Sequence, residues 1–134
     1  MQFVEAFNDL GYDVPNHRQA WSAEKSDGIC ITLWKAEMGK RDGLMWMDTR
    51  VHADSWEDWG NKPGNKWRIG HLRRALGEFG GKVDVVIVSG KPGESYGTAQ
   101  PWKAEGMRAH TYWQVSNFEE TTGHFEVSLQ QNAS

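Results

Sequence analysis

Tryptophan is abundant in this sequence, and its flat ring binds other flat rings. The chain has eight tryptophans in 134 residues. Four of them fall in two loops rich in glycine and proline, or at the start of a basic segment: Trp56, Trp59, Trp67 and Trp102. A base stacked on such a ring contributes about 1–3 kcal/mol to binding. These rings are candidate ligand-binding residues, with the alternative that they only cover the core of a small, loop-rich domain.

Positive charge is concentrated beside these rings. The net charge is −3, yet the window 61–82 holds six basic residues and one acidic residue. Cations that share one face would bind phosphate groups. The residues of this window that we expect to contact a ligand are Asn65, Lys66, Trp67, Arg68 and Arg73. The alternative is an amphipathic helix with a solvated charged face.

Spacings typical of catalytic and metal sites are missing from the sequence. The five histidines form no His-x-x-x-His pair, the single cysteine falls within a predicted strand, and no Gly-x-Ser-x-Gly motif occurs. We therefore predict no catalytic residue, no metal site and no cofactor. A small enzyme acting on a nucleotide or a sugar is an alternative, and it would require Asp58, His52 or His71 to converge in a concave pocket.

Length and composition are typical of one globular domain. Of the 134 residues, 38% are hydrophobic and 25% are charged, so we expect 1–134 to form a single domain. The longest apolar run, 85–88, is too short to cross a bilayer, and the N-terminal residues lack the pattern of a signal peptide. One cysteine excludes an internal disulfide. We expect a cytoplasmic protein that does not enter membranes.

Hydrophobic periodicity predicts an α+β fold. Helices are predicted at about 2–10 and 66–78. The second helix has an apolar stripe of Ile69, Leu72, Leu76 and Phe79, and Asn65 as its cap. Strands are predicted at 28–34, 44–50, 83–88, 111–115 and 124–129, the first two and the last two forming hairpins. The segments 12–27, 51–64 and 89–108 are predicted loops. The expected architecture is a single mixed or antiparallel sheet of about five strands, with 83–88 central and two helices packed on it.

Three segments of this pattern resemble a known module. They are Gly28–Trp34, then Gly64-Asn65-Lys66-Trp67-Arg68-Ile69 at the start of a helix, then 83–89. Together they cover about half of the chain and are similar to the N-terminal modified-cytosine-binding module of McrA-type restriction endonucleases, and to small bacterial proteins of no known function. The resemblance implies recognition of a modified DNA base by Asn65, Trp67 and Arg68. The cysteine- and histidine-rich nuclease domain of those endonucleases has no counterpart in this sequence, so cleavage is not implied.

The leading hypothesis is a non-catalytic, bacterial or phage-type binding module that recognises a nucleotide or a modified nucleic-acid base. Its loop tryptophans would stack on the base, and its basic segment would bind phosphate. The runner-up is a protein-interaction module, inhibitor-like or immunity-like, that uses the same rings as hot spots against a protein partner. The negative net charge argues against coating of duplex DNA through bulk electrostatics. The oligomeric state does not follow from the sequence.

Overall fold

The computed structural model describes residues 2–14, 21–53, 55–91 and 95–131. These residues form eight strands, four α-helices and two short 3₁₀ turns. The α-helices are α1 (Phe3–Asp9), α2 (Thr49–His52), α3 (Trp56–Trp59) and α4 (Pro63–Glu78). The strands are β1 (Ser22–Lys25), β2 (Gly28–Trp34), β3 (Gly39–Arg41), β4 (Leu44–Asp48), β5 (Lys82–Lys91), β6 (Ser95–Pro101), β7 (Thr111–Ser116) and β8 (Glu126–Gln131). No described helix has both the length and the apolar character needed to cross a membrane.

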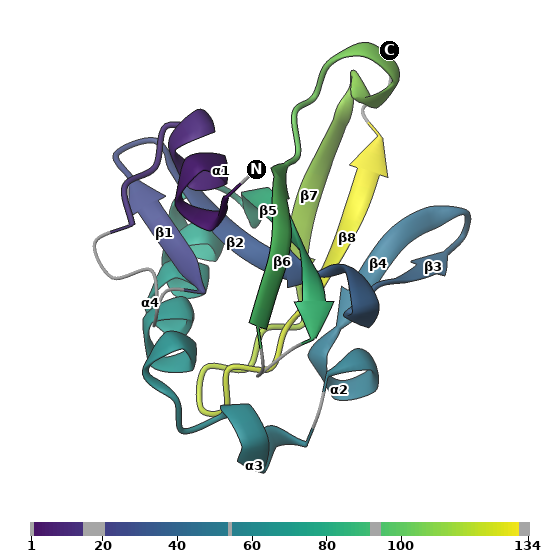
Figure 1. The fold of residues 1–134 in the computed structure, drawn as a ribbon. Coiled ribbons are helices and arrows are strands. Elements are labelled where there is room, and N and C mark those ends of the chain that lie inside the picture. The colour runs from purple at the N-terminus through teal and green to yellow at the C-terminus, as the bar shows by residue number, and fades with distance from the viewer. Residues whose placement is uncertain (1, 15–20, 54, 92–94, 132–134) are drawn as a thin grey trace.

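One mixed sheet organises the fold (Figure 1). Its strand order is β1-β2-β5-β7-β8-β4-β3, and β6 pairs with β5 beside this path. The pair β2 and β5 is parallel, and the other pairs are antiparallel. The connection between the two parallel strands contains α4, which packs on β1 and β2. The strand predicted to be central, 83–88, is β5, which has three neighbours in the sheet.

The side chains of β2 and β5 point alternately to the two faces of the sheet, so these strands contribute to two separate core clusters. On one face, Ile31 and Val85 pack with Leu72 of α4. On the other face, Cys30 and Val86 pack with α1. Successive side chains of a strand point to opposite faces, so a strand covered on both faces must be apolar throughout. This explains the nearly continuous apolar sequences of β2 and β5, and α1 and α4 therefore cover opposite faces of the sheet.

The predicted fold class is confirmed in its coarse form, since the fold is α+β with a mixed sheet. The predicted numbers of elements were too low. About five strands and two helices were predicted, and the described residues form eight strands and four α-helices. The segments 12–27 and 89–108, predicted as loops, contain β1 and β6, and 51–64 contains α3. β1 and β6 form by pairing with β2 and β5, a tertiary effect that local patterns do not report. Within these segments, 15–20, 54 and 92–94 lie outside the described residues.

The predicted hairpin between 28–34 and 44–50 is wrong. β4 pairs with β3 and β8, whereas β2 pairs with β1 and β5. The turn closes a tighter hairpin instead, formed by β3 and β4 around Asp42 and Gly43. Both residues have positive φ, 53° and 80°, which two-residue hairpin turns of type I′ require. The predicted C-terminal hairpin is confirmed, as β7 pairs with β8.

Candidate ligand site at the start of helix α4

The buried face of α4 differs from the apolar stripe predicted for it. Pro63 occupies the first position of the helix, where its missing N–H costs nothing. The residues of α4 that face inward are Gly64, Asn65, Arg68, His71, Leu72 and Ala75, whereas Leu76 of the predicted stripe is exposed. Three polar side chains, those of Asn65, Arg68 and His71, thus lie on the buried face, where the prediction placed apolar side chains. Asn65 falls in the first turn, after the N-cap residue Lys62, so the prediction that Asn65 caps the helix is also wrong.

Asn65 joins the start of α4 to two other segments. Its Nδ2 donates hydrogen bonds to the carbonyls of Gly60, at 2.9 Å, and Thr122, at 2.8 Å. The indole N–H of Trp56 donates to the same Thr122 carbonyl, at 2.7 Å. These bonds tie α3, α4 and the β7–β8 connection together. The Oδ1 atom of Asn65 is buried without a hydrogen-bond partner.

Two glycines make this close approach possible. A Cβ on Gly64 would lie 2.4 Å from the ring of Trp21, and a Cβ on Gly123 would lie 2.2 Å from Oδ1 of Asn65. Gly123 also has a φ of +90°, a conformation that side chains disfavour. Only glycine fits at both positions without displacing a neighbour.

Arg68 is buried among three aromatic rings and is only 8% exposed. Its guanidinium carbon lies 4.9 Å from the ring centre of Trp21, 5.6 Å from that of Trp59 and 4.8 Å from that of Phe125. Its Nε has no hydrogen-bond partner, and no carboxylate among the described residues lies within ion-pair distance. Burial lowers the pKa of Arg68 to about 10, opposed by the charge of Glu37. Arg68 is therefore a protonated cation at neutral pH, stabilised by ring faces.

His124 lies against the same tryptophan. Its ring meets Trp59 edge-on, with 5.1 Å between the ring centres, and its Nδ1 lies 2.9 Å from the hydroxyl of Thr49. Burial and the charge of Arg50 lower the pKa of His124, with a smaller contribution from Arg68, while Glu119 and Asp48 oppose them. Trp59 therefore contacts both Arg68 and His124, one from α4 and one from the β7–β8 connection.

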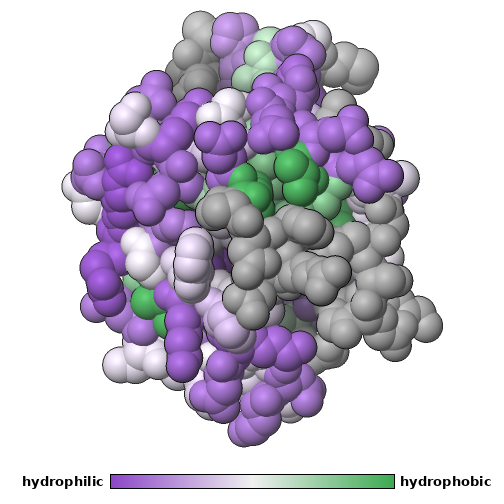
Figure 2. All heavy atoms as spheres, turned by 60° about the vertical axis from the view of Figure 1, so that its left-hand side comes forward, coloured by the Kyte–Doolittle hydropathy of each residue, from purple (hydrophilic) through white to green (hydrophobic). Residues whose placement is uncertain are grey.

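The structure brings four of the eight predicted site residues together. Trp56 and Trp59 of α3 and Asn65 and Arg68 of α4 meet around the β7–β8 connection. Lys66, Trp67 and Arg73 lie on the exposed side of α4, and Trp67 is 54% exposed. Figure 2, with the side of β1 and α4 turned forward, shows mostly hydrophilic side chains there and hydrophobic ones only in small patches.

Trp102 lies apart from the other predicted site residues. Its ring packs edge-on against Trp113, with 5.4 Å between ring centres, its Nε1 donates to Thr111, and Arg108 covers it at 4.0 Å. The connection from β6 to β7 rises at the end of the sheet opposite α3 (Figure 1). Trp102 thus packs on the core at the far end of the molecule from Trp56 and Trp59.

The six basic residues of 61–82 do not share one face. Arg68 is buried, Arg73 pairs with Glu120, and Arg74 pairs with Glu24 and Glu78. The ammonium group of Lys82 lies over a tyrosine ring at the other end of α4. The positive charge near the aromatic cluster is therefore that of Arg68, together with the exposed Lys62 and Lys66 at the start of the helix.

Sequence reasoning missed Trp21, His124 and Phe125 as members of this cluster. Trp21 falls in the predicted loop 12–27, and Phe125 falls in the ordinary strand pattern of 124–129. His124 has no partner at a characteristic spacing in the sequence. All three reach the cluster through contacts with residues far away in the chain, for which the local sequence carries no signal.

The residues required by the enzymatic alternative do not converge. His52 packs against Trp46, Asp58 is exposed on α3, and His71 lies between α4 and β1. Among the described residues, no group of three or more His, Cys, Asp or Glu side chains is placed to hold a metal ion.

His71 does stand in a serine–histidine–carboxylate arrangement. Its Nδ1 lies 2.6 Å from the hydroxyl of Ser22, and its Nε2 lies 3.5 Å from Glu24. A nucleophile, a base and an orienting acid follow this order in hydrolases. Ser22 is only 2% exposed, however, so a substrate does not reach its hydroxyl. The arrangement instead holds β1 against α4.

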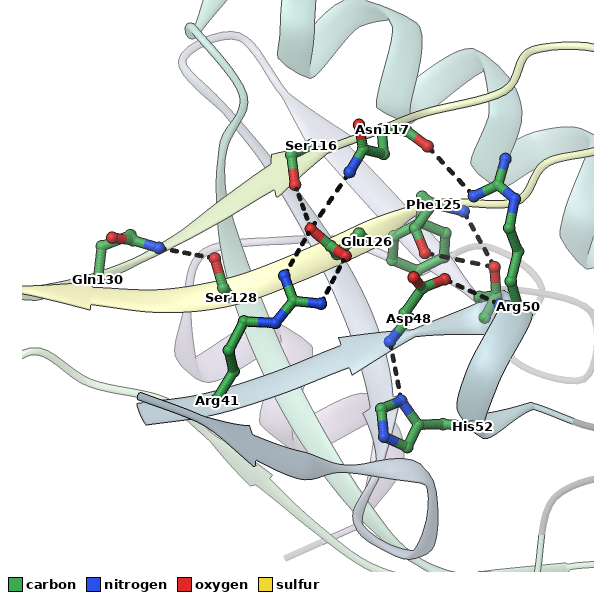
Figure 3. A network of polar contacts seen from close by, with 11 residues as sticks. Arg41, Asp48, Arg50, His52, Ser116, Asn117, Phe125, Glu126, Ser128 and Gln130 are labelled. Atoms are coloured by element: carbon green, nitrogen blue, oxygen red, sulfur yellow. Dashed lines mark hydrogen bonds and ion pairs between the residues drawn. The ribbon is translucent and has the colours of Figure 1, made fainter. Parts of the chain in front are cut away.

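A second buried polar cluster surrounds Glu126 on β8 (Figure 3). Its carboxylate accepts hydrogen bonds from Arg41 at 3.4 Å, Ser116 at 3.1 Å and Asn117 at 3.3 Å. Burial alone would raise the pKa of Glu126. The polar hydrogens of Trp46 and Ser116, together with the charge of Arg41, outweigh the effect of burial, so the pKa of Glu126 is lowered. Glu126 is thus fully paired within the protein, and it holds β3, β7 and β8 together.

Comparison of the chain with protein-family models, with curated proteins and with solved structures gives no match. The function is therefore inferred from the chemistry of the cluster at the start of α4.

Proposed function

We propose that the protein is a non-catalytic binding module that recognises a nucleotide or a nucleic-acid base, modified bases included, at the start of α4. The observation that carries this proposal is the buried guanidinium of Arg68, held between three rings with no described carboxylate in ion-pair distance. A buried cation without a counter-ion is costly. A ligand that brings an anionic or acceptor oxygen to the guanidinium removes part of this cost.

The surroundings of Arg68 favour a flat, polar ligand. Trp56 and Trp59 are half-buried and Trp67 is exposed, so all three rings of this part of the chain are at least partly accessible to a ligand. Bases stack on such rings and on arginine planes, and cations such as Lys62 and Lys66 bind the phosphates that follow a base. Asn65 lies on the same side of the helix as Arg68, since residues three apart are neighbours there, and at 1% exposure it positions α3 and the β7–β8 connection rather than contacting a ligand.

A protein partner is the second candidate, because Trp67 is a large exposed ring. Protein interfaces place such rings at the centre of an apolar patch. The described part of the face carrying β1 and α4 is mostly hydrophilic instead (Figure 2). This surface fits a small polar ligand better than an apolar protein interface.

Binding is tested by titrating the protein with nucleotides and with DNA oligonucleotides, with and without modified cytosine, while tryptophan emission is recorded. We expect saturable quenching by at least one of these probes, with an affinity that falls as salt rises. Arg68→Met removes the charge and keeps much of the volume, and it should weaken binding at least tenfold, because a hydrogen bond to a charged group contributes about 1.5–3 kcal/mol.

The matched control is Arg108→Met. Arg108 also lies over a tryptophan ring, that of Trp102, but at the opposite end of the sheet. This variant should bind as the parent protein does. Equal losses in both variants, or emission unchanged by every probe, would contradict the proposed function. Circular dichroism and thermal unfolding confirm that each variant is folded.

A further inference from the structure

We propose that His124 is a ligand-binding residue of this site, which donates from Nε2 to the anionic group of the ligand and binds it with uptake of a proton. This inference rests on the proposed function, because it assigns a further residue and a protonation step to the same site. It is carried by the position of His124 on Trp59, by its bond to Thr49 and by the charges around it.

Trp59 contacts both His124 and Arg68. The imidazole centre lies 5.1 Å from the ring centre of Trp59, and the guanidinium carbon of Arg68 lies 5.6 Å from it. The two groups are close enough for the charge of Arg68 to act on His124. His124 is therefore the candidate for a second nitrogen donor to an anion that binds Arg68.

Thr49 holds one ring nitrogen of His124 and leaves the other available. The Thr49 hydroxyl oxygen lies 2.9 Å from Nδ1 and accepts the backbone N–H of Phe125, at 3.0 Å. The hydroxyl proton can point at Nδ1, and in that tautomer of the neutral imidazole the ring proton is on Nε2. Nε2 has no hydrogen-bond partner among the described residues, and His124 is partly exposed. Within the described part of the chain, Nε2 is therefore a donor without an acceptor.

The same threonine allows His124 to gain a proton without losing a hydrogen bond. The carbonyl of Phe125 lies 3.3 Å from the Thr49 hydroxyl and is a second acceptor for its proton. When Nδ1 becomes protonated, it donates to the Thr49 oxygen, and the hydroxyl proton turns to the Phe125 carbonyl. Both protonation states of the imidazole are thus accommodated by one arrangement of heavy atoms.

Charged groups from four neighbouring segments act on His124. Arg50 of α2 and Arg68 of α4 disfavour the charged imidazole, and Glu119 of the β7–β8 connection and Asp48 of β4 favour it. Trp59 of α3 contributes an uncharged ring. Arg50 is itself paired with Glu119, so Arg68 is the cation of this set without an ion pair among the described residues. A bound anion would offset Arg68 and raise the pKa of His124 from its lowered value.

A pH titration of affinity tests this inference. Suitable probes are a short single-stranded DNA oligonucleotide and a nucleoside 3′,5′-cyclic monophosphate, because their phosphodiesters keep the same charge between about pH 6 and 8. At constant ionic strength, affinity should rise at least threefold as the pH falls through this range, since the free protein has the lower histidine pKa and the complex the higher. NMR titration of the His124 ring protons should show the same rise in pKa on binding.

Two histidine variants separate a ligand contact from a structural effect. His124→Asn keeps an amide near the position of Nδ1 for Thr49 but has no counterpart of Nε2, and it should bind with an affinity independent of pH. His110→Asn is the matched control, because His110 is exposed at the opposite end of the sheet and its φ of 65° suits asparagine. It should keep the full pH dependence.

The outcomes distinguish this inference from the proposed function. Binding that is independent of pH in the parent protein, or an unchanged pH dependence in His124→Asn, overturns the role of His124 and leaves the site at Arg68 intact. Failure of both probes, and of the nucleotides and modified oligonucleotides used to test the proposed function, to bind at every pH overturns the proposed function and this inference with it.

Discussion

The guanidinium of Arg68 lies 4.8 Å from the ring centre of Phe125, across the boundary between helix α4 and the residues that lead into β8. This contact closes a cluster of rings around a cation that has no described counter-ion. Protein interiors rarely keep such a cation for stability alone, because replacing buried ionic groups by apolar ones is often neutral or stabilising. We therefore expect the guanidinium of Arg68 to lower the stability of the fold while it contributes to ligand binding.

Arg68→Met should therefore stabilise the protein while it weakens ligand binding. The thioether side chain fills the space between the rings and has no desolvation cost, so we expect a gain of about 1 kcal/mol in the free energy of unfolding. Urea unfolding measures it. Arg74→Met, on the same helix, should be destabilising, because Arg74 is paired with Glu24 and Glu78 and donates to the carbonyl of Lys25. A large loss of stability in Arg68→Met would show that the guanidinium is a structural element.

Two glycines of α4 should respond oppositely to alanine. Gly64→Ala forces a Cβ to within 2.4 Å of Trp21, so we expect a loss of about 1–3 kcal/mol in the free energy of unfolding and weaker ligand binding. Gly70→Ala adds a Cβ with no atom within 4 Å, and should gain about 0.5–1 kcal/mol from the higher helix propensity of alanine. Equilibrium unfolding of both variants provides the comparison. Similar effects at the two positions would contradict the packing of Trp21 on α4.

The sequence predicted the parts of the fold that depend on local pattern. The helix that became α4 and the strands that became β2 and β5 follow from apolar periodicity, and Asn65 and Arg68 were identified as site residues beside the loop tryptophans. The burial of Arg68 did not follow, because a charged residue between apolar positions is normally exposed. Its burial depends on Trp21 and Phe125, which directly precede β1 and β8. Trp102 was assigned to the same site because composition does not tell which loops share an end of the sheet.

Stability should fall at acidic pH because of His71. Burial lowers the pKa of His71 from its ordinary value of 6.5, opposed by Glu24 and assisted by Arg74. Between the lowered folded value and 6.5, the unfolded chain binds more protons than the folded protein, so the free energy of unfolding decreases as the pH drops through this window. Urea unfolding from about pH 5 to pH 8 measures this decrease. His71→Gln should reduce the slope, and the exposed His110→Gln should leave it unchanged.

The partly buried hydrogen bond between Tyr12 and Asp84 should contribute to stability independently of the ligand site. The Tyr12 hydroxyl donates to Asp84 at 2.6 Å beneath α1. Tyr12→Phe leaves this carboxylate without its partner, so we expect a loss of about 1–3 kcal/mol in the free energy of unfolding, with ligand affinity unchanged. Tyr112→Phe, which removes a hydroxyl from a half-buried ring on β7, should have a small effect. A change in affinity in Tyr12→Phe would indicate that α1 contributes to the site.

The Nε–H resonance of Arg68, followed by nitrogen–proton NMR while a binding oligonucleotide or nucleotide is added, tests the role of the buried cation most directly. The resonance is assigned by its absence in Arg68→Met. We predict that it shifts and saturates with the same affinity that tryptophan emission reports, while the Nε–H of Arg108 stays in place. An Arg68 resonance that does not move as the ligand saturates the protein would contradict a site at the start of α4.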